Sequence, residues 1–206
     1  MIEIIFEDNH LLVVNKLGGI LTQPSGTDLP SLEAEAKKYI KETYKKPGNV
    51  FLEAVHRIDK PVSGIVVFAK TSKALSRLND ALRSKNMRKV YWALLDKQPK
   101  PSQSTLEHFL IHDEHRARVS QDGKMARLHY KTLSNGIVEI ELETGRYHQI
   151  RVQMAEIGCP IVGDSKYGST KTFAGIALHH RQLELVHPTT GESLIFTANL
   201  PSSWPL

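Results

Sequence analysis

The chain has 206 residues, of which 40% are hydrophobic and 24% charged, and its formal net charge is +5. This balance is that of an ordinary globular protein with a sizeable core, and the positive charge favours an anionic partner such as nucleic acid. A single cysteine, Cys159, excludes an internal disulfide and any zinc or iron–sulfur site built from several cysteines.

The N-terminal segment MIEIIFEDNH carries acidic residues and lacks the layout of a signal peptide. No apolar stretch in the sequence approaches the roughly 20 residues that span a bilayer. We therefore expect a cytoplasmic protein that makes no membrane contact.

Two β-rich runs, 2–7 and 10–16, open the predicted structure and are separated by a short turn. A loop rich in glycine and proline follows, and Ser31 is then placed to cap a helix that extends to about residue 46. One face of this helix is rich in lysine, which is either a solvated surface or a surface that contacts RNA.

Residues 64–70 form a continuous apolar run, which is typical of a strand buried on both faces. Thr71 or Ser72 is placed to cap the next helix, whose apolar residues recur at helical spacing and are expected to face the core. The basic segment RSKNMRK follows this helix, and residues 90–96 predict a further strand.

Between Ser104 and Glu143 apolar and polar residues alternate in several short runs, which predicts antiparallel strands. A helix is predicted from about Tyr147 to a stop at Gly158, and two strands then bracket the turn PTTGE near the C-terminus. The sequence therefore predicts one α+β domain over residues 1–206, built on a mixed, mainly antiparallel sheet with flanking helices.

The segment AVHRIDKPVSGIVVFAK raises the first question about function. Directly before its apolar half it crowds together four ionisable residues: His56, Arg57, Asp59 and Lys60. A solvent-facing turn is one explanation. The other is that Asp59 is a working carboxylate, held ionised by its cationic neighbours and presented at the edge of a cleft.

A second charged cluster lies in ETGRYHQIRVQMAEIG, residues 143–158. Helical spacing places Arg151 one turn into the predicted helix, on the same face as His148, where it could pair with a carboxylate at an adjacent strand end. A structural ion pair is the alternative, and spacing alone leaves both open.

Histidines offer two possible metal sites. His108, His112 and His115 have a spacing compatible with metal ligands, but their segment alternates like a strand and lacks a supporting motif. His179 and His180 are consecutive, so on a strand they face opposite ways and do not hold one ion together. Neither pattern predicts a metal centre.

Other enzyme classes find little support in the motifs. Asp59 and Asp164 could form the acid pair of a glycoside hydrolase, but Asp164 lies between a glycine and SKYG, where a role in a turn is favoured. The sequence contains no phosphate-binding loop, dinucleotide fingerprint or GxSxG motif.

Four blocks, in this order, closely resemble the RluA-type pseudouridine synthases: HRIDKPVSGIVVFAK, RKVYWALL, TGRYHQIRVQMAEIGCPIVGDSKYG and LHHRQLELVHPTTGE. The resemblance runs from about Ile4 to Pro201. It implies the pseudouridine synthase fold with a central catalytic cleft, in a compact member without the N-terminal RNA-binding module of many relatives. It also implies isomerisation of uridine to pseudouridine in ribosomal or transfer RNA.

The resemblance further implies the roles of individual residues. It places the catalytic aspartate at Asp59, as nucleophile or base, and the active-site tyrosine at Tyr91, which would offer a stacking face for uracil. Arg151 would orient Asp59 and favour its charged form. Arg57 would fill the gap left by a flipped-out uridine and contact neighbouring bases or phosphates.

Three more residues are expected beside the substrate. His56 either assists Arg57 or packs, Lys60 balances local charge or contacts a phosphate, and Leu178 forms an apolar wall of the pocket or part of the core. RNA is the expected partner, with no obligatory protein partner. No metal or organic cofactor is implied, because the reaction is redox-neutral and the base is retained.

Three positions depart from the usual residues of the family: Leu17 replaces a proline, Val62 a threonine and Gln153 a histidine. The last two bear on substrate contacts. A non-catalytic RNA-binding protein is the main rival interpretation, and the joint presence of Asp59, Tyr91 and Arg151 argues against it. Six basic residues are expected to contact RNA phosphates: Lys37, Lys38, Arg83, Lys85, Arg88 and Lys89.

Overall fold

The computed structural model of the chain describes every residue except 1, 27, 28 and 206. Contacts among its elements divide it into two compact units: Met1–Met87 with Arg181–Pro201, and Arg88–His180 with Ser202–Leu206. The fold is α+β, as predicted, whereas the single domain over residues 1–206 stays a prediction. No helix in the described part of the chain is long and apolar enough to cross a membrane.

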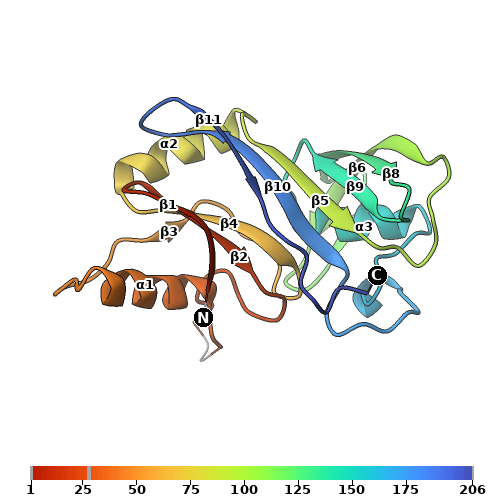
Figure 1. Cartoon of the computed structure of the whole chain (residues 1–206). Helices are drawn as coiled ribbons and strands as arrows, with labels where there is room; N and C mark the ends of the chain where they lie inside the picture. Colours follow the sequence, from red (N-terminus) through yellow and green to blue (C-terminus); the bar gives the residue numbers. More distant parts are fainter. Residues whose placement is uncertain (1, 27–28, 206) are drawn as a thin grey trace. The chain divides into compact units, whose positions relative to one another are not determined.

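The strands of the first unit run in the order β1-β2-β4-β10, with β3 pairing β4 and β11 pairing β10 (Figure 1). Their bounds are β1 Glu3–Glu7, β2 Leu11–Lys16, β3 Glu53–Ala54, β4 Ser63–Ala69, β10 Leu178–Val186 and β11 Ser193–Thr197. Every residue of β2 and β4 is buried, which confirms the predicted strand with two covered faces. β10 begins in the second unit and continues into the first.

Two helices, α1 (Leu32–Thr43) and α2 (Ser72–Arg83), lie on opposite sides of this sheet (Figure 1). Ser31 and Thr71 cap them as the sequence predicts, because each side-chain oxygen accepts a hydrogen bond from the backbone N–H three residues later. One apolar cluster joins α2 to β2, β4, β10 and β11: Leu11, Val13, Ile65, Val67, Ala74, Leu78, Leu183, Leu185 and Phe196.

The second unit is an antiparallel sheet in the order β5-β9-β8-β6-β7. Its strands are β5 Arg88–Ala93, β6 Gln103–His112, β7 Ala117–Val119, β8 Lys124–Thr132 and β9 Val138–Leu142. They confirm the antiparallel strands that alternation predicts over residues 104–143. The third helix, α3 (Gln149–Glu156), packs on β6 and β7 through an apolar cluster: Leu110, Ala117, Ala126, Val152 and Tyr167.

α3 begins later than predicted, because His148 adopts a left-handed conformation with φ 51° and ψ 24°. This conformation ends the preceding loop and leaves Gln149 as the first helical residue, so the prediction that His148 lies within the helix is wrong. The His148 ring is buried, and its Nδ1 forms a hydrogen bond of 2.8 Å with the hydroxyl of Tyr167. A side-chain contact outside the helix thus fixes the entry to α3.

Candidate active site

The predicted site residues are distributed over both units. His56, Arg57, Asp59 and Lys60 belong to the first unit, and Tyr91, Arg151 and Leu178 belong to the second.

Asp59 lies in a turn between β3 and β4. Its backbone carbonyl accepts a hydrogen bond from the N–H of Val62 at 3.0 Å, which closes the turn. The preceding residue, Ile58, is held by Thr22, whose hydroxyl donates to the Ile58 carbonyl at 2.9 Å and accepts from the Ile58 N–H at 3.2 Å. A residue from a distant loop therefore fixes the backbone on one side of the Asp59 carboxylate.

A buried lysine fixes the other side of this turn. Lys16, at the end of β2, is 0% exposed, and its Nζ donates to three backbone carbonyls: those of Leu17 (3.0 Å), Ile20 (2.8 Å) and Lys60 (3.1 Å). The Lys60 carbonyl also accepts from the N–H of Gly19 at 2.8 Å. An ammonium has three N–H donors and no acceptor, so the three carbonyls satisfy it completely.

The charge of Lys16 is coupled to that of Asp59. Burial lowers the pKa of Lys16 to about 7, and the Asp59 carboxylate acts in the opposite direction. Sequence reasoning missed Lys16. The signal that points to it is a single charged residue that ends an otherwise apolar strand, LLVVNK, immediately before a loop of glycines.

The other charged residues around Asp59 differ in exposure. Arg57 and Lys60 are exposed, so their side chains are open to solvent. His56 is half-buried, and its Nε2 accepts a hydrogen bond from the N–H of Val67 at 3.3 Å. Of the two roles expected for His56, this contact supports packing against β4.

Tyr91 lies on β5 and is 7% exposed. One face of its ring stacks on His180 of β10, with ring centroids 4.4 Å apart and planes inclined by 12°. The ring of the neighbouring His179 instead meets the ring of Trp204 edge-on, with centroids 5.9 Å apart, so the two histidines face opposite ways, as predicted. Leu178, at the start of the same strand, is buried. His180 thus covers one of the two faces that Tyr91 could offer to a base.

Arg151 forms a buried ion pair with Asp164. The Arg151 Nε and one terminal nitrogen donate to the two Asp164 oxygens at 2.7 and 2.9 Å, and both side chains are almost fully buried. The Tyr167 ring lies against the guanidinium, with its centroid 5.1 Å from the central carbon. The structural ion pair that the sequence left open is therefore present, and Asp164 is its carboxylate.

Two departures from the family pattern are core residues. Gln153 is 0% exposed, and its Nε2 donates to the carbonyls of Leu106 and Ala126, both at 3.3 Å, and lies 3.0 Å from the Nδ1 of His108. Val62 is also buried. Gln153 thus attaches α3 to β6 and β8.

His108 and His112 lie on β6, and His115 lies in the turn that follows it, which confirms the strand predicted there. Within the described residues, no group of three or more His, Cys, Asp or Glu is arranged to hold a metal ion.

Residues 10–156 match a family model described as RNA pseudouridylate synthase. The chain belongs to this family. Among its relatives, the uncharacterized RNA pseudouridine synthase YhcT of Bacillus subtilis is 37% identical over 98% of this synthase chain, which spans 69% of that protein. The ribosomal large subunit pseudouridine synthase D of Zymomonas mobilis is 33% identical over 100% of the chain, which spans 71% of it.

A third relative, the tRNA pseudouridine synthase C of Yersinia pestis, is 30% identical over 99% of this synthase chain, which spans 88% of that protein. Among solved structures, human RNA pseudouridylate synthase domain containing 4 superposes with a TM-score of 0.82 at 24% identity, covering 97% of this chain and 89% of the human one. These matches confirm the predicted RluA-type family and the predicted fold.

The contacts of Lys16 generate a prediction about stability and pH. In the folded chain the pKa of Lys16 is about 7, and its ordinary value is 10.5. Between these pH values the unfolded chain binds the extra proton, so this group makes the free energy of unfolding rise with pH. Lys16→Met lacks this titration and leaves three buried carbonyls without a donor.

We therefore expect Lys16→Met to be less stable than the parent chain, by a margin that grows from pH 7 to pH 10. Urea unfolding at several pH values measures this margin. Lys38→Met, which alters an exposed lysine paired with Glu42, is the control. A margin for Lys16→Met that stays constant across this pH range contradicts the lowered pKa.

The buried ion pair of the second unit generates another prediction. Asp164→Ala leaves the Arg151 guanidinium buried without its carboxylate, and we expect the free energy of unfolding to fall by roughly 3–5 kcal/mol. The double variant Asp164→Leu with Arg151→Met removes both charges and should lose less. Urea unfolding of the single and double variants compares them, and a double variant that is less stable than Asp164→Ala contradicts the argument.

Proposed function

We propose that this chain converts specific uridines of ribosomal or transfer RNA to pseudouridine, and that Asp59 is its nucleophile or base. The names of its relatives support both RNA classes, since one is a ribosomal and another a transfer RNA synthase. We further propose that the protein acts in the cytoplasm, where its single cysteine would stay reduced.

The reaction breaks the bond between C1′ of the ribose and N1 of uracil. The base turns, C5 bonds to C1′ in its place, C5 loses its proton and N1 gains one, so no electrons are gained or lost. A carboxylate can attack C1′ as a nucleophile, or it can act as a base on the ribose or the uracil.

The observation that carries this proposal is the rigid mounting of Asp59. Thr22 holds the backbone before it, and Lys16 and Gly19 hold the carbonyl of the residue after it. A reacting group contributes most when its geometry is set before the substrate arrives, because ordering it then costs nothing during the reaction. A turn that served only as a solvated link would need none of these contacts.

The second unit supplies the other proposed groups. A guanidinium has five N–H donors, more than the two that Asp164 uses, and we propose that Arg151 also orients and charge-balances Asp59. Tyr91 would contact the uracil with the ring face opposite His180, and its hydroxyl could transfer a proton. Leu178 would form part of the apolar wall.

The exposed cations of the first unit suit the entry of the RNA. A uridine in folded RNA must leave its stack to reach a carboxylate, at a cost of a few kcal/mol. Arg57, exposed and two residues from Asp59, is placed to fill the vacated position, while Lys60 would meet a nearby phosphate. His56 would support Arg57 through its packing on β4.

The proposal is tested by Asp59→Asn, which keeps the size of the side chain and removes its charge and its nucleophilic oxygen. We expect pseudouridine formation to fall by roughly a thousandfold or more, while the protein remains folded and still binds RNA. The substrate is first identified by mapping pseudouridines in RNA from cells with and without the gene. The same RNA then serves for turnover measurements with each variant.

A folded Asp59→Asn protein with substantial turnover contradicts the proposed role of Asp59. A parent chain that binds RNA and forms no pseudouridine in any mapped RNA supports the rival, a non-catalytic RNA-binding protein.

The role of Arg57 gives a second prediction. If Arg57 stabilises the flipped-out state, Arg57→Ala should slow modification of a uridine in a stem-loop by about tenfold more than in an unstructured oligomer, where stacking is already lost. Single-turnover rates on the two RNAs measure the difference. Arg83→Ala, which alters an exposed arginine paired with Asp80, is the control. Equal losses on both RNAs reduce Arg57 to a general electrostatic contact.

A further inference from the structure

The structure separates the six basic residues that the sequence offers as phosphate contacts. Four of them have a carboxylate partner: Lys37 with Glu33, Lys38 with Glu42, Arg83 with Asp80, and Arg88 with Glu141. Lys85 is exposed in a turn after α2. Lys89 differs from all of these, because it is half-buried and no described residue forms a hydrogen bond or ion pair with its Nζ.

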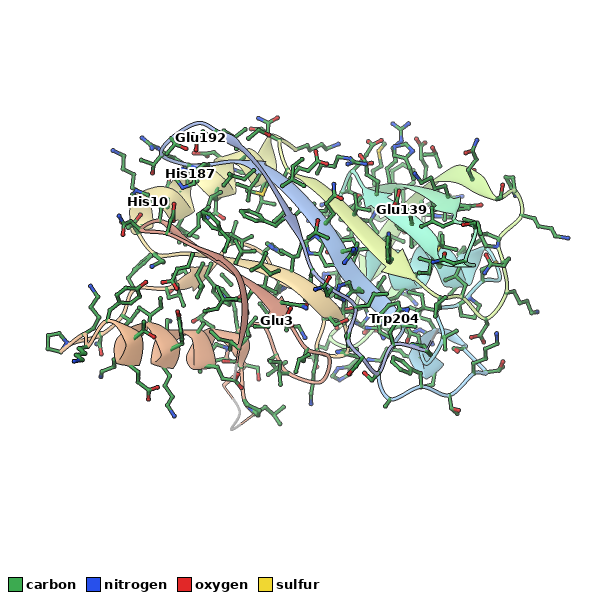
Figure 2. The ribbon with its side chains drawn as sticks, in the orientation of Figure 1. Glu3, His10, Glu139, His187, Glu192 and Trp204 are labelled. Atoms are coloured by element: carbon green, nitrogen blue, oxygen red, sulfur yellow. The ribbon has the colours of Figure 1, made fainter. Side chains whose placement is uncertain are left out.

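The alternation of β5 explains why Lys89 has no acidic partner. Lys89 and Tyr91 point to one face of the strand, and the residues opposite them on β9 are Leu142 and Ile140. The acids of β9 point to the other face, where Glu141 pairs with Arg88 and Glu139 (Figure 2) accepts from Trp92: these contacts are 2.8 and 3.2 Å long. Lys89 therefore extends over apolar neighbours, and burial lowers its pKa.

A glycine leaves space beside the Lys89 ammonium. A Cβ atom added to Gly145 would lie 3.8 Å from the Lys89 Nζ. A side chain at position 145 would therefore occupy the space next to this ammonium. Gly145 is exposed, so the space is open to solvent. The backbone of Gly145 does not require a glycine for its φ angle, since it is absent from the positive-φ glycines of the described chain.

The loop that contains Gly145 is held on both sides by Gln149. The Gln149 Oε1 accepts from the Thr144 hydroxyl at 2.7 Å and from the Arg146 N–H at 3.0 Å. The Gln149 Nε2 donates to the carbonyl of Arg127 at 3.1 Å. These hydrogen bonds fix the position of the loop, so the space beside Lys89 is a built feature of the second unit.

We propose that Lys89 binds a phosphodiester of the RNA, next to the uridine that Tyr91 contacts. A half-buried cation without a partner is unfavourable, and a phosphate that reaches it across Gly145 removes that cost and forms a charge-assisted hydrogen bond. Two residues of a strand span about 7 Å, so the phosphate would lie beside the base rather than at a remote part of the RNA. The position beside Tyr91 rests on the function proposed above.

The test measures how RNA affinity depends on salt, with an unmodified transfer RNA transcript as the probe. Lys89→Met keeps the aliphatic stem of the side chain and removes the charge. We expect it to weaken binding roughly tenfold at low salt. The slope of log K against log salt should become shallower by roughly 0.8, the value for one phosphate contact. Lys89→Arg keeps the positive charge, so its slope should match that of the parent chain.

Lys131→Met is the matched control, because it removes a lysine charge of the same unit that already has a carboxylate partner, Glu139, at 2.9 Å. We expect its slope to match that of the parent chain. Lys89→Met should keep or raise the melting temperature, since it removes an unpaired half-buried charge. An unchanged slope for Lys89→Met, or an equal decrease in slope for Lys131→Met, overturns the proposal.

Two outcomes keep this proposal distinct from the proposed function. The salt dependence of RNA affinity is measured without turnover. It therefore tests the phosphate contact of Lys89 even if Asp59→Asn remains active and the proposed role of Asp59 is wrong. The position beside Tyr91 is tested with the mapped substrate, in which the phosphate on either side of the modified uridine is replaced by a neutral methylphosphonate. One of these replacements should lower the RNA affinity of the parent chain and leave the affinity of Lys89→Met unchanged. If neither replacement has this effect, the position of the phosphate beside Tyr91 is wrong.

Discussion

The ammonium of Lys16 ties three backbone carbonyls together inside the first unit. A buried lysine is tolerated only when its donors are satisfied, so the glycine-rich loop after β2 and the turn of Asp59 must adopt the positions that supply those acceptors. One cation, placed at the end of a fully buried strand, therefore sets the backbone on which the proposed chemistry depends.

The second unit orders its polar groups by the same means. Asp164 holds the Arg151 guanidinium in one plane through two hydrogen bonds, and Gln149 joins the residues on either side of Gly145. In both places a buried polar side chain is satisfied by partners on other segments: Arg151 by Asp164, and Gln149 by the loop before α3 and by the carbonyl of Arg127. Such networks specify one arrangement, because any other leaves a buried donor or acceptor without a partner.

The sequence predicted most of the elements, because the signals for them are local. The apolar run over residues 64–70 and the Ser31 cap are visible within a few residues, and both are present. The start of α3 was not predictable in this way, since the left-handed conformation of His148 interrupts a spacing that continues through it. For the proposed site, motif resemblance suggested Asp59 and Arg151, whereas the contact of Lys16 with the Lys60 carbonyl and the pairing of Arg151 with Asp164 cannot be predicted from a local pattern.

The conformation of His148 has a consequence for experiments that infer function from tolerance to substitution. A φ of 51° is uncommon for any residue other than glycine, and it is a pronounced outlier for β-branched ones. In a library randomised at this codon and selected for activity, most replacements would be lost through backbone strain and through the loss of the hydrogen bond to Tyr167. Glycine and asparagine would survive better than chemically closer residues. A selection profile of that shape identifies a position constrained by its backbone, even where it lies three residues from a proposed site residue such as Arg151.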